Sequence, residues 1–276
     1  MNKNIKQPKV GLALGSGGPR GLAHIGVIKV LEENNIPIDF IAGCSIGAMV
    51  GGLYALTKDI NWIEKMFLKT NWRQIISFLA EPAFFSGGLV GGEKIERFIL
   101  EQTGRKKFED LKIPFIAIAT DINTGEEVKI KEGSLAKAIR ASSSIPLVFK
   151  PAKWKNKLLV DGGLSNPVPS DVVRKMGAEI VIAVNLDAHL FQNKDRTKIY
   201  NDKFGVYTIA KKAIDALRCH LAQCRLQNTD IVITPKVGGI SWTKFAKGQE
   251  IVRKGEIEIR LVLPKIREHL DHLTKF

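Results

Sequence analysis

A serine at the centre of the pattern G-x-S-x-G, Gly43-Cys44-Ser45-Ile46-Gly47, is the first candidate for chemistry in this sequence. The apolar residues from Ile38 to Ile41 predict a short buried strand before it, and the run Ala48–Leu56 predicts a helix after it. Strand, sharp turn and helix are the context in which this pattern forms a nucleophile elbow. A serine in so tight a turn needs neighbours with almost no side chain, which Gly43 and Gly47 supply. The pattern also arises by chance in glycine-rich chains, so the prediction of a nucleophilic Ser45 depends on the flanking elements.

A glycine-rich turn, Gly15-Ser16-Gly17-Gly18-Pro19-Arg20-Gly21, joins the predicted strand 10–14 to a predicted helix that ends near Asn34. Free backbone N–H groups at the start of a helix suit an anion. Such a turn could be a dinucleotide or phosphate loop, an oxyanion hole, or a plain structural turn. The dinucleotide pattern G-x-G-x-x-G fails because Arg20 stands where its third glycine belongs, and the Walker pattern is absent. We favour an oxyanion hole because Ser45 lies only one strand away.

Asp161 ends the predicted strand 157–160 and is followed by Gly162 and Gly163. An aspartate in this position is placed like a catalytic acid or base, although a turn aspartate would look the same. Because its ordinary pKa lies near 3.9, an aspartate must be desolvated or pre-aligned before it can act as a base for a hydroxyl. An oxyanion hole can contribute about 3–4 kcal/mol per donor, which offsets a weak base.

A histidine could complete a Ser-Asp-His triad instead. Four histidines follow Asp161 in the chain: His189, His220, His269 and His272. Chain order therefore permits a triad. None of the four stands in a strand-end loop with glycines, and His24 is predicted to be a buried helix residue. We prefer a Ser-Asp dyad.

Alternating strands and helices must position these residues. Strands are predicted at 113–120, 179–185 and 231–234, with 127–130 forming a hairpin through Asn123-Thr124-Gly125. Helices are predicted at 93–103, 135–141 and 202–225, and a closing helix carries Pro264 as a kink. The first strand is apolar on both faces, which is typical of a covered parallel sheet.

Two segments leave alternatives open. Residues 58–92 look mostly helical and carry six aromatic side chains: Trp62, Phe67, Trp72, Phe78, Phe84 and Phe85. They predict either a helical insertion packed on the sheet or a mobile apolar flap that lines an acyl pocket or touches lipid. The run Ser142–Ser144 could touch substrate, but serines cap helix ends and loops far more often.

Composition bounds the class of protein. The chain has 276 residues, 45% of them hydrophobic and 25% charged, as in ordinary globular proteins. Its three cysteines form neither a disulfide framework nor a C-x-x-C pattern, so we expect reduced thiols, no metal site and a cytoplasmic location. No transmembrane helix or signal peptide is predicted. The formal net charge of +14 suits an anionic membrane surface or nucleic acid, although a solvated basic surface explains it equally well.

Three motifs in this order, Gly17-Gly18-Pro19-Arg20-Gly21, Gly43–Gly47 and Asp161-Gly162-Gly163, resemble the patatin-like phospholipase family over roughly residues 8–235. The resemblance implies an α/β fold, a three-layer sandwich whose mainly parallel central sheet has helices on both faces. It also implies acyl ester hydrolysis by a dyad, with Ser45 as nucleophile and Asp161 as base. Backbone N–H groups of Gly17 and Gly18, together with Arg20, would hold the oxyanion. The remaining motif glycines would support these turns: Gly21, Gly43, Gly47, Gly162 and Gly163.

These observations give one set of expectations. Residues 8–235 form the acyl hydrolase domain, and 236–276 form a C-terminal helical extension packed on it. The substrate is a lipid ester such as a phospholipid or lysophospholipid, cleaved without a cofactor. We expect no nucleic acid partner, and peripheral contact with an anionic membrane is a further hypothesis. The alternatives are a non-catalytic lipid-binding or regulatory protein and, third, a nucleotide-binding enzyme.

Overall fold

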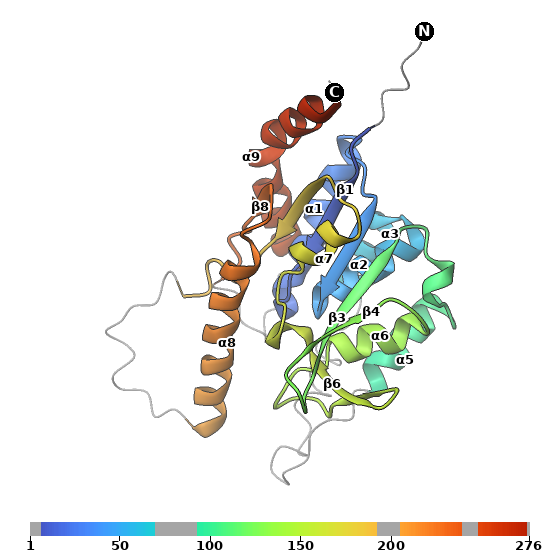
Figure 1. Ribbon diagram of the computed structural model, residues 1–276, viewed down its shortest axis with the longest axis vertical. Coiled ribbons are helices and arrows are strands. Elements are labelled where there is room, and N and C mark those ends of the chain that lie inside the picture. Colours follow the sequence, from blue (N-terminus) through green and yellow to red (C-terminus); the bar gives the residue numbers. More distant parts are fainter. Residues whose placement is uncertain (1–6, 70–92, 192–204, 239–247, 275–276) are drawn as a thin grey trace.

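A computed structural model describes residues 7–69, 93–191, 205–238 and 248–274 of the protein (Figure 1). In this part of the chain a central sheet of eight strands has the order β5-β6-β3-β2-β1-β7-β8, and β4 pairs with β3. The strands are β1 Val10–Leu14, β2 Phe40–Cys44, β3 Phe115–Asp121, β4 Glu127–Ile130, β5 Ala152–Trp154, β6 Lys157–Asp161, β7 Ile180–Val184 and β8 Ile231–Ile233. The sequence predicts each of these strands except β5.

Helices connect these strands. The α-helices are α1 Ala23–Glu33, α2 Ile46–Thr57, α3 Ile60–Lys69, α5 Glu93–Thr103, α6 Leu135–Ser142, α7 Ser170–Lys175, α8 Val206–Arg225 and α9 Gly248–Thr274. Short 3₁₀ turns are η1 Gly18–Leu22, η3 Phe108–Asp110 and η4 Gly162–Leu164. Of these helices, none is long and apolar enough to cross a lipid bilayer.

The sheet is covered on both faces, and alternate strand residues show this directly. Strands β3, β2, β1, β7 and β8 are parallel, whereas β4, β5 and β6 run antiparallel to their neighbours. In β1, Leu12 and Leu14 belong to a large hydrophobic cluster with α1, α2 and α9, while Ala13 between them belongs to a smaller cluster with α7. Such alternation places successive side chains on opposite faces of a strand. The predicted three-layer α/β fold is confirmed.

The closing helix α9 packs along α1 (Figure 1). Two glycines make this close approach possible. A Cβ atom on Gly26 of α1 would lie 2.1 Å from the carbonyl oxygen of Val252, and one on Gly255 of α9 would lie 2.0 Å from that of Ala23. The C-terminal segment therefore shares the core of the sheet, and the boundary drawn at residue 235 remains a prediction.

Only the first part of the aromatic segment 58–92 is described. It forms α3, in which Phe67 is fully buried and Trp62 is partly buried against the core. This packing agrees with a helical insertion for residues up to Lys69. Residues 70–92, with the proposed flap aromatics from Trp72 to Phe85, lie outside the described residues.

Candidate active site

Ser45 occupies the turn between β2 and α2. Its backbone has φ 56° and ψ −121°, in the left-handed half of conformational space that a residue with a side chain rarely adopts. A Cβ atom on Gly43 would lie 2.4 Å from the carbonyl oxygen of Gly47, and one on Gly47 would lie 2.1 Å from that of Leu14. Both glycines of G-x-S-x-G are therefore required by backbone contacts, as an elbow demands.

A serine from the triple-serine run holds this elbow in place. The backbone N–H of Ser45 donates to Ser142 Oγ over 2.9 Å, and Ser142 Oγ donates in turn to the carbonyl oxygen of Ile118 over 2.5 Å. The hydroxyl thus links α6, the elbow and β3. The sequence offers no pattern that distinguishes this buried serine from its two neighbours.

Asp161 reaches Ser45 because two strands meet end to end beside β3. β2 pairs with β3 up to Cys44 opposite Ile118, and β6 pairs with it from Asp161 opposite Ala119 onward. β4 pairs with β3 residues Ala117–Thr120, some of which also pair with β2 and others with β6. Because one edge of a strand pairs with one neighbour at each residue, β4 must lie along the opposite edge of β3 from both. β2 and β6 therefore share one edge of β3 and approach from opposite directions. Their carboxyl ends, which carry Ser45 and Asp161, meet there.

The carboxylate of Asp161 is buried and well oriented. It accepts hydrogen bonds from the Gly163 N–H over 2.8 Å and from the Cys44 thiol over 3.9 Å. Burial raises the pKa of Asp161, and the nearby Ser45 side chain, the Gly163 N–H and the charge of Arg218 oppose the rise only in part. An aspartate whose pKa is raised is a better proton acceptor than one in water.

The glycine loop after β1 lies beside the elbow, because β1 and β2 are adjacent and parallel. The N–H groups of Gly15 and Ser16 donate to the carbonyl oxygens of Val184 and Pro167, over 3.1 Å and 2.9 Å. Within the described residues, the N–H groups of Gly17 and Gly18 have no such acceptor. These two donors are available to an anion, as an oxyanion hole requires.

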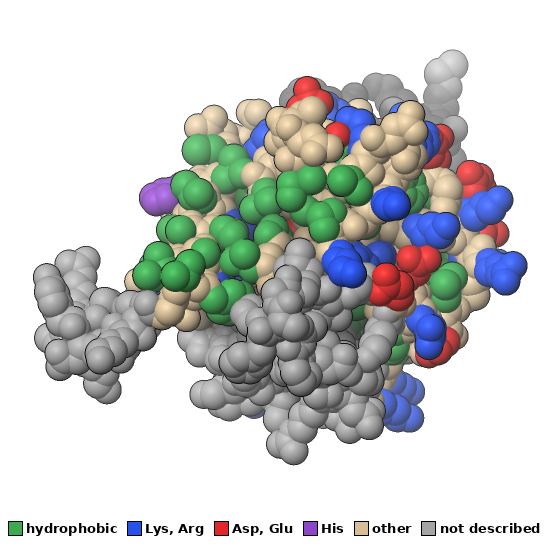
Figure 2. Space-filling view, turned by 90° about the horizontal axis from the view of Figure 1, so that it is seen from below, with side chains coloured by type: hydrophobic (Ala, Val, Ile, Leu, Met, Phe, Trp, Pro, Cys, Tyr) green, Lys and Arg blue, Asp and Glu red, His purple; other side chains and the backbone are tan. Residues whose placement is uncertain are grey.

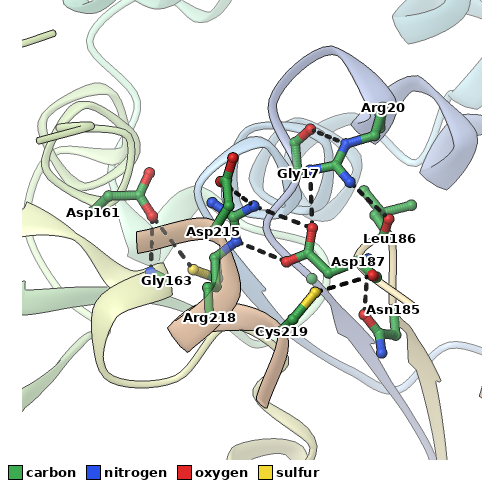
Figure 3. A network of polar contacts seen from close by, with 12 residues as sticks. Gly17, Arg20, Asp161, Gly163, Asn185, Leu186, Asp187, Asp215, Arg218 and Cys219 are labelled. Carbon is green, nitrogen blue, oxygen red and sulfur yellow. Dashed lines mark hydrogen bonds and ion pairs between the residues drawn. The ribbon is translucent and has the colours of Figure 1, made fainter. Parts of the chain in front are cut away.

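The Arg20 side chain takes a different place from the one expected. Its Nε donates to the carbonyl oxygen of Gly17 and its Nη1 to that of Leu186, both over 3.1 Å. Its Nη2 forms an ion pair with Asp187 over 2.9 Å (Figure 3). The guanidinium therefore donates to the glycine loop and to the segment that follows β7, and these contacts hold the loop.

The other predicted glycines allow close approach. A Cβ atom on Gly21 would lie 2.2 Å from Ile46 Cγ1, so η1 can pack on the start of α2. One on Gly162 would lie 2.3 Å from the carbonyl oxygen of Ile118. One on Gly163 would lie 3.0 Å both from Asp161 Oδ1 and from the Cδ atom of Arg218.

His24, His189 and His269 form hydrogen bonds with groups other than the dyad. His24 Nε2 donates to the carbonyl oxygen of Gly15 over 2.8 Å, and burial lowers the pKa of His24 to about 4, so the ring is neutral. His189 bonds to the carbonyl oxygen of Thr234, and His269 to that of Lys265 within its own helix. His24 thus supports the glycine loop from behind.

Asp187 and Arg218 belong to the site but were not predicted from the sequence. Asp187 follows β7 at the same edge of the sheet at which Ser45 follows β2, and that position is the one signal that could have identified it. Arg218 lies inside α8 and belongs to no motif. Among the described residues, no three His, Cys, Asp or Glu side chains gather so that they could hold a metal ion.

Several known proteins are similar to this chain. The family model described as patatin-like phospholipase matches residues 12–174. An uncharacterised NTE family protein of Mycobacterium tuberculosis is 40% identical over 188 residues, which are 67% of this chain and 51% of that protein. Human patatin-like phospholipase domain-containing protein 6 is 31% identical over 212 residues, 75% of this chain and 15% of that protein.

The fold also has a solved counterpart. The crystal structure of VipD from Legionella pneumophila superposes with a TM-score of 0.56 at 14% identity, covering 94% of this chain and 67% of that chain. The chain spans about half the length of the mycobacterial relative and a smaller share of the human one. The matched residues include both the elbow and Asp161. This chain belongs to the patatin-like phospholipase family.

Proposed function

We propose that the protein hydrolyses acyl esters of lipids, phospholipids or lysophospholipids, through a Ser45–Asp161 dyad. Family membership supports lipid acyl hydrolase activity in general. The observation that supports the dyad is the meeting of the carboxyl ends of β2 and β6, which brings the Ser45 side chain near enough to the buried carboxylate of Asp161 to oppose the rise in its pKa.

The proposed reaction proceeds in two halves. Asp161 accepts the proton of the Ser45 hydroxyl as Ser45 Oγ attacks the ester carbonyl carbon. The carbonyl oxygen becomes an oxyanion, which accepts hydrogen bonds from the N–H groups of Gly17 and Gly18. The carbon–oxygen bond breaks, the leaving alcohol takes the proton, and an acyl-serine remains. Water then attacks the acyl-serine and gives a proton to Asp161; the bond to Ser45 Oγ breaks, Asp161 passes that proton to Oγ, and the fatty acid leaves.

The experiment is a turnover screen across short-chain esters, phospholipids and lysophospholipids, with Ser45→Ala as the paired control. We expect wild-type hydrolysis that is lost in Ser45→Ala. Hydrolysis that persists in Ser45→Ala would contradict the assignment of the nucleophile. Lipid binding without any turnover would favour the alternative, a non-catalytic lipid-binding or regulatory protein.

We also propose that the protein docks peripherally on an anionic membrane through its active-site end. Helix α8 presents an apolar stripe that the fold does not bury: Val206 is 84% exposed, Ile209 56% and Leu217 71%. Figure 2 looks at the end of the molecule where the parallel strands finish, and shows hydrophobic side chains gathered there with lysines and arginines beside them. A net charge of +14 favours an anionic surface, since each basic residue near such a surface can contribute about 1 kcal/mol.

A matched pair of variants tests this docking. Leu217→Ser on α8 should weaken binding to anionic vesicles by about five-fold, because an exposed leucine that enters lipid contributes on the order of 1 kcal/mol. Leu261→Ser on α9, where Leu261 is 67% exposed, should leave binding unchanged. Sedimentation with anionic and neutral vesicles at two salt concentrations gives the measurement. Equal binding to both vesicle types, or equal losses in the two variants, would contradict docking through α8.

A further inference from the structure

Four charged side chains form a cluster behind the glycine loop, in which Arg20 and Asp187 are buried and Arg218 and Asp215 are half-buried (Figure 3). The carboxylate of Asp187, 2% exposed, accepts from Arg20 Nη2 over 2.9 Å, from Arg218 Nε over 2.7 Å and from Arg218 Nη2 over 3.2 Å. Arg218 Nη2 also lies 3.0 Å from Asp215 Oδ1. Lys211 Nζ also pairs with Asp215 Oδ2 over 2.8 Å, so each carboxylate of the cluster is paired with two cations, and pairing is the condition under which buried charges are tolerated.

Asp187 is the centre of this cluster. Burial alone would raise the pKa of Asp187, but the charges of Arg218 and Arg20 hold it below its ordinary value, so the group stays ionised. Removing its charge would leave two buried guanidinium groups facing each other without an anion between them. The position of Arg20 therefore depends on Asp187, and that of Asp187 depends on Arg218.

The geometry of one peptide bond connects this cluster to catalysis. Arg20 Nε holds the carbonyl oxygen of Gly17, and that carbonyl shares a peptide unit with the N–H of Gly18. No peptide bond in the described residues is cis, so the Gly17 C=O and the Gly18 N–H point in opposite directions. Holding the carbonyl on Arg20 therefore directs the Gly18 N–H away from Arg20.

We propose that Asp187 and Arg218 are positioning residues, which act through Arg20 to fix the direction in which Gly18 N–H is presented to the oxyanion. The inference rests on the proposed function for the identity of that anion. Arg218 touches the other half of the site as well, because its Cδ atom lies 3.0 Å from the place a Gly163 Cβ would take, and Gly163 N–H donates to Asp161. A single side chain of α8 thus contacts the Asp161 turn directly and reaches the glycine loop through Asp187.

The first test needs no turnover. Glycine carrying ¹³C at the carbonyl and ¹⁵N at the amide gives carbonyl–amide correlations only for the six Gly-Gly pairs of the sequence: 17–18, 51–52, 87–88, 91–92, 162–163 and 238–239. We expect Asp187→Asn to shift or broaden the 17–18 signal and to leave 51–52 unchanged. The control is Asp230→Asn, which removes a different Arg–Asp pair, Arg174–Asp230, and should leave the 17–18 signal unmoved.

The second test measures the consequence for catalysis. In Asp187→Asn we expect kcat per titrated active site to fall by about 10- to 100-fold, less than the roughly 10²- to 10³-fold cost of deleting an oxyanion donor outright. KM should change little, because the oxyanion exists only in the transition state. Arg218→Lys keeps the positive charge with fewer donors and should lie between Asp187→Asn and wild type. This variant also serves if Asp187→Asn does not fold.

Each outcome decides the proposal. An unchanged 17–18 signal in Asp187→Asn and Arg218→Lys would overturn it whether or not the enzyme turns over. So would an altered signal with wild-type kcat, or a loss of kcat that Asp230→Asn reproduces. Absence of any Ser45-dependent turnover in the wild type would instead refute the proposed function, and the spectroscopic result would still decide whether the cluster sets the loop.

Discussion

Two turns at neighbouring strand ends, the elbow after β2 and the glycine loop after β1, are built by different means. The elbow is shaped by tight backbone packing: a Cβ atom on Gly43 would lie 2.4 Å from the carbonyl oxygen of Gly47, and one on Gly47 would lie 2.1 Å from that of Leu14 at the end of β1. The glycine loop is held from a distance, by His24 behind Gly15 and by Arg20, whose partners Leu186 and Asp187 follow β7.

This difference separates steric from electrostatic control. A strained elbow fails when a side chain is added to it, because backbone atoms cannot yield. A loop held by ion pairs is disturbed when a distant charge is removed, because its backbone N–H groups then lose their fixed direction. In the proposed reaction both turns act on the same ester carbonyl, so that reaction would need both kinds of control.

Gly47→Ala should have the largest effect and would break the elbow. The new Cβ would lie 2.1 Å from the carbonyl oxygen of Leu14, so we expect a loss of about 3 kcal/mol or more in the free energy of unfolding, with loss of turnover. Urea denaturation and ester hydrolysis measure both. Gly104→Ala is the control, because a Cβ there meets nothing within 4 Å and only the left-handed backbone, φ 66°, is strained. It should cost about 1 kcal/mol.

Gly17→Ala tests the loop and should be milder for stability. Its Cβ would meet the side chain of Leu186, at 2.7 Å from Cδ1 and 2.9 Å from Cβ, and no backbone atom is among these contacts. We expect a loss of about 1–2 kcal/mol in unfolding free energy, together with a lower kcat because the loop must shift. If Gly17→Ala proved as unstable as Gly47→Ala, the contrast between the two turns would be wrong.

Asp161→Asn should uncouple activity from stability. Because the folded-state pKa of Asp161 is raised, its contribution to stability is full below the unfolded pKa near 3.9 and is lost as pH rises through the folded value. At pH 7 we therefore expect Asp161→Asn to unfold at a higher urea concentration than wild type, with the difference shrinking toward pH 4. A variant that is less stable than wild type at pH 7 would contradict a desolvated carboxylate.

Histidine substitutions should have the smallest effect on chemistry. His189→Ala, His220→Ala, His269→Ala and His272→Ala should each keep kcat within about three-fold of wild type, since a dyad uses no imidazole. A loss on the order of 10⁴-fold in any one of them would indicate a triad. His24→Ala is expected to reduce stability, because His24 is buried and bonded to Gly15.

The elements and the elbow could be predicted from sequence because they depend on local patterns. Apolar runs located β1, β2, β3 and β7, and the need for small residues at Gly43 and Gly47 follows from the motif, although Gly47 meets the end of β1 only in the folded chain. The short strand β5 was missed because only three residues pair, and Pro151 before it gave no strand signal.

The support of the glycine loop could not be predicted in the same way. Asp187 and Arg218 are distant from Arg20 in the chain, and their pairing exists only once β7 and α8 are placed beside β1. The exposure of the apolar stripe on α8 could not be predicted either, because apolar residues at helical spacing ordinarily predict a buried face.

The dyad is tested most directly by the rate at which a fluorophosphonate labels Ser45, measured against pH in wild type and Asp161→Asn. We predict labelling at Ser45, with a rate that rises with pH through the raised pKa of Asp161 and then levels. In Asp161→Asn the rate should be at least about 10²-fold slower and nearly independent of pH over that range. Labelling at another residue, or equal rates in the two proteins, would contradict the dyad.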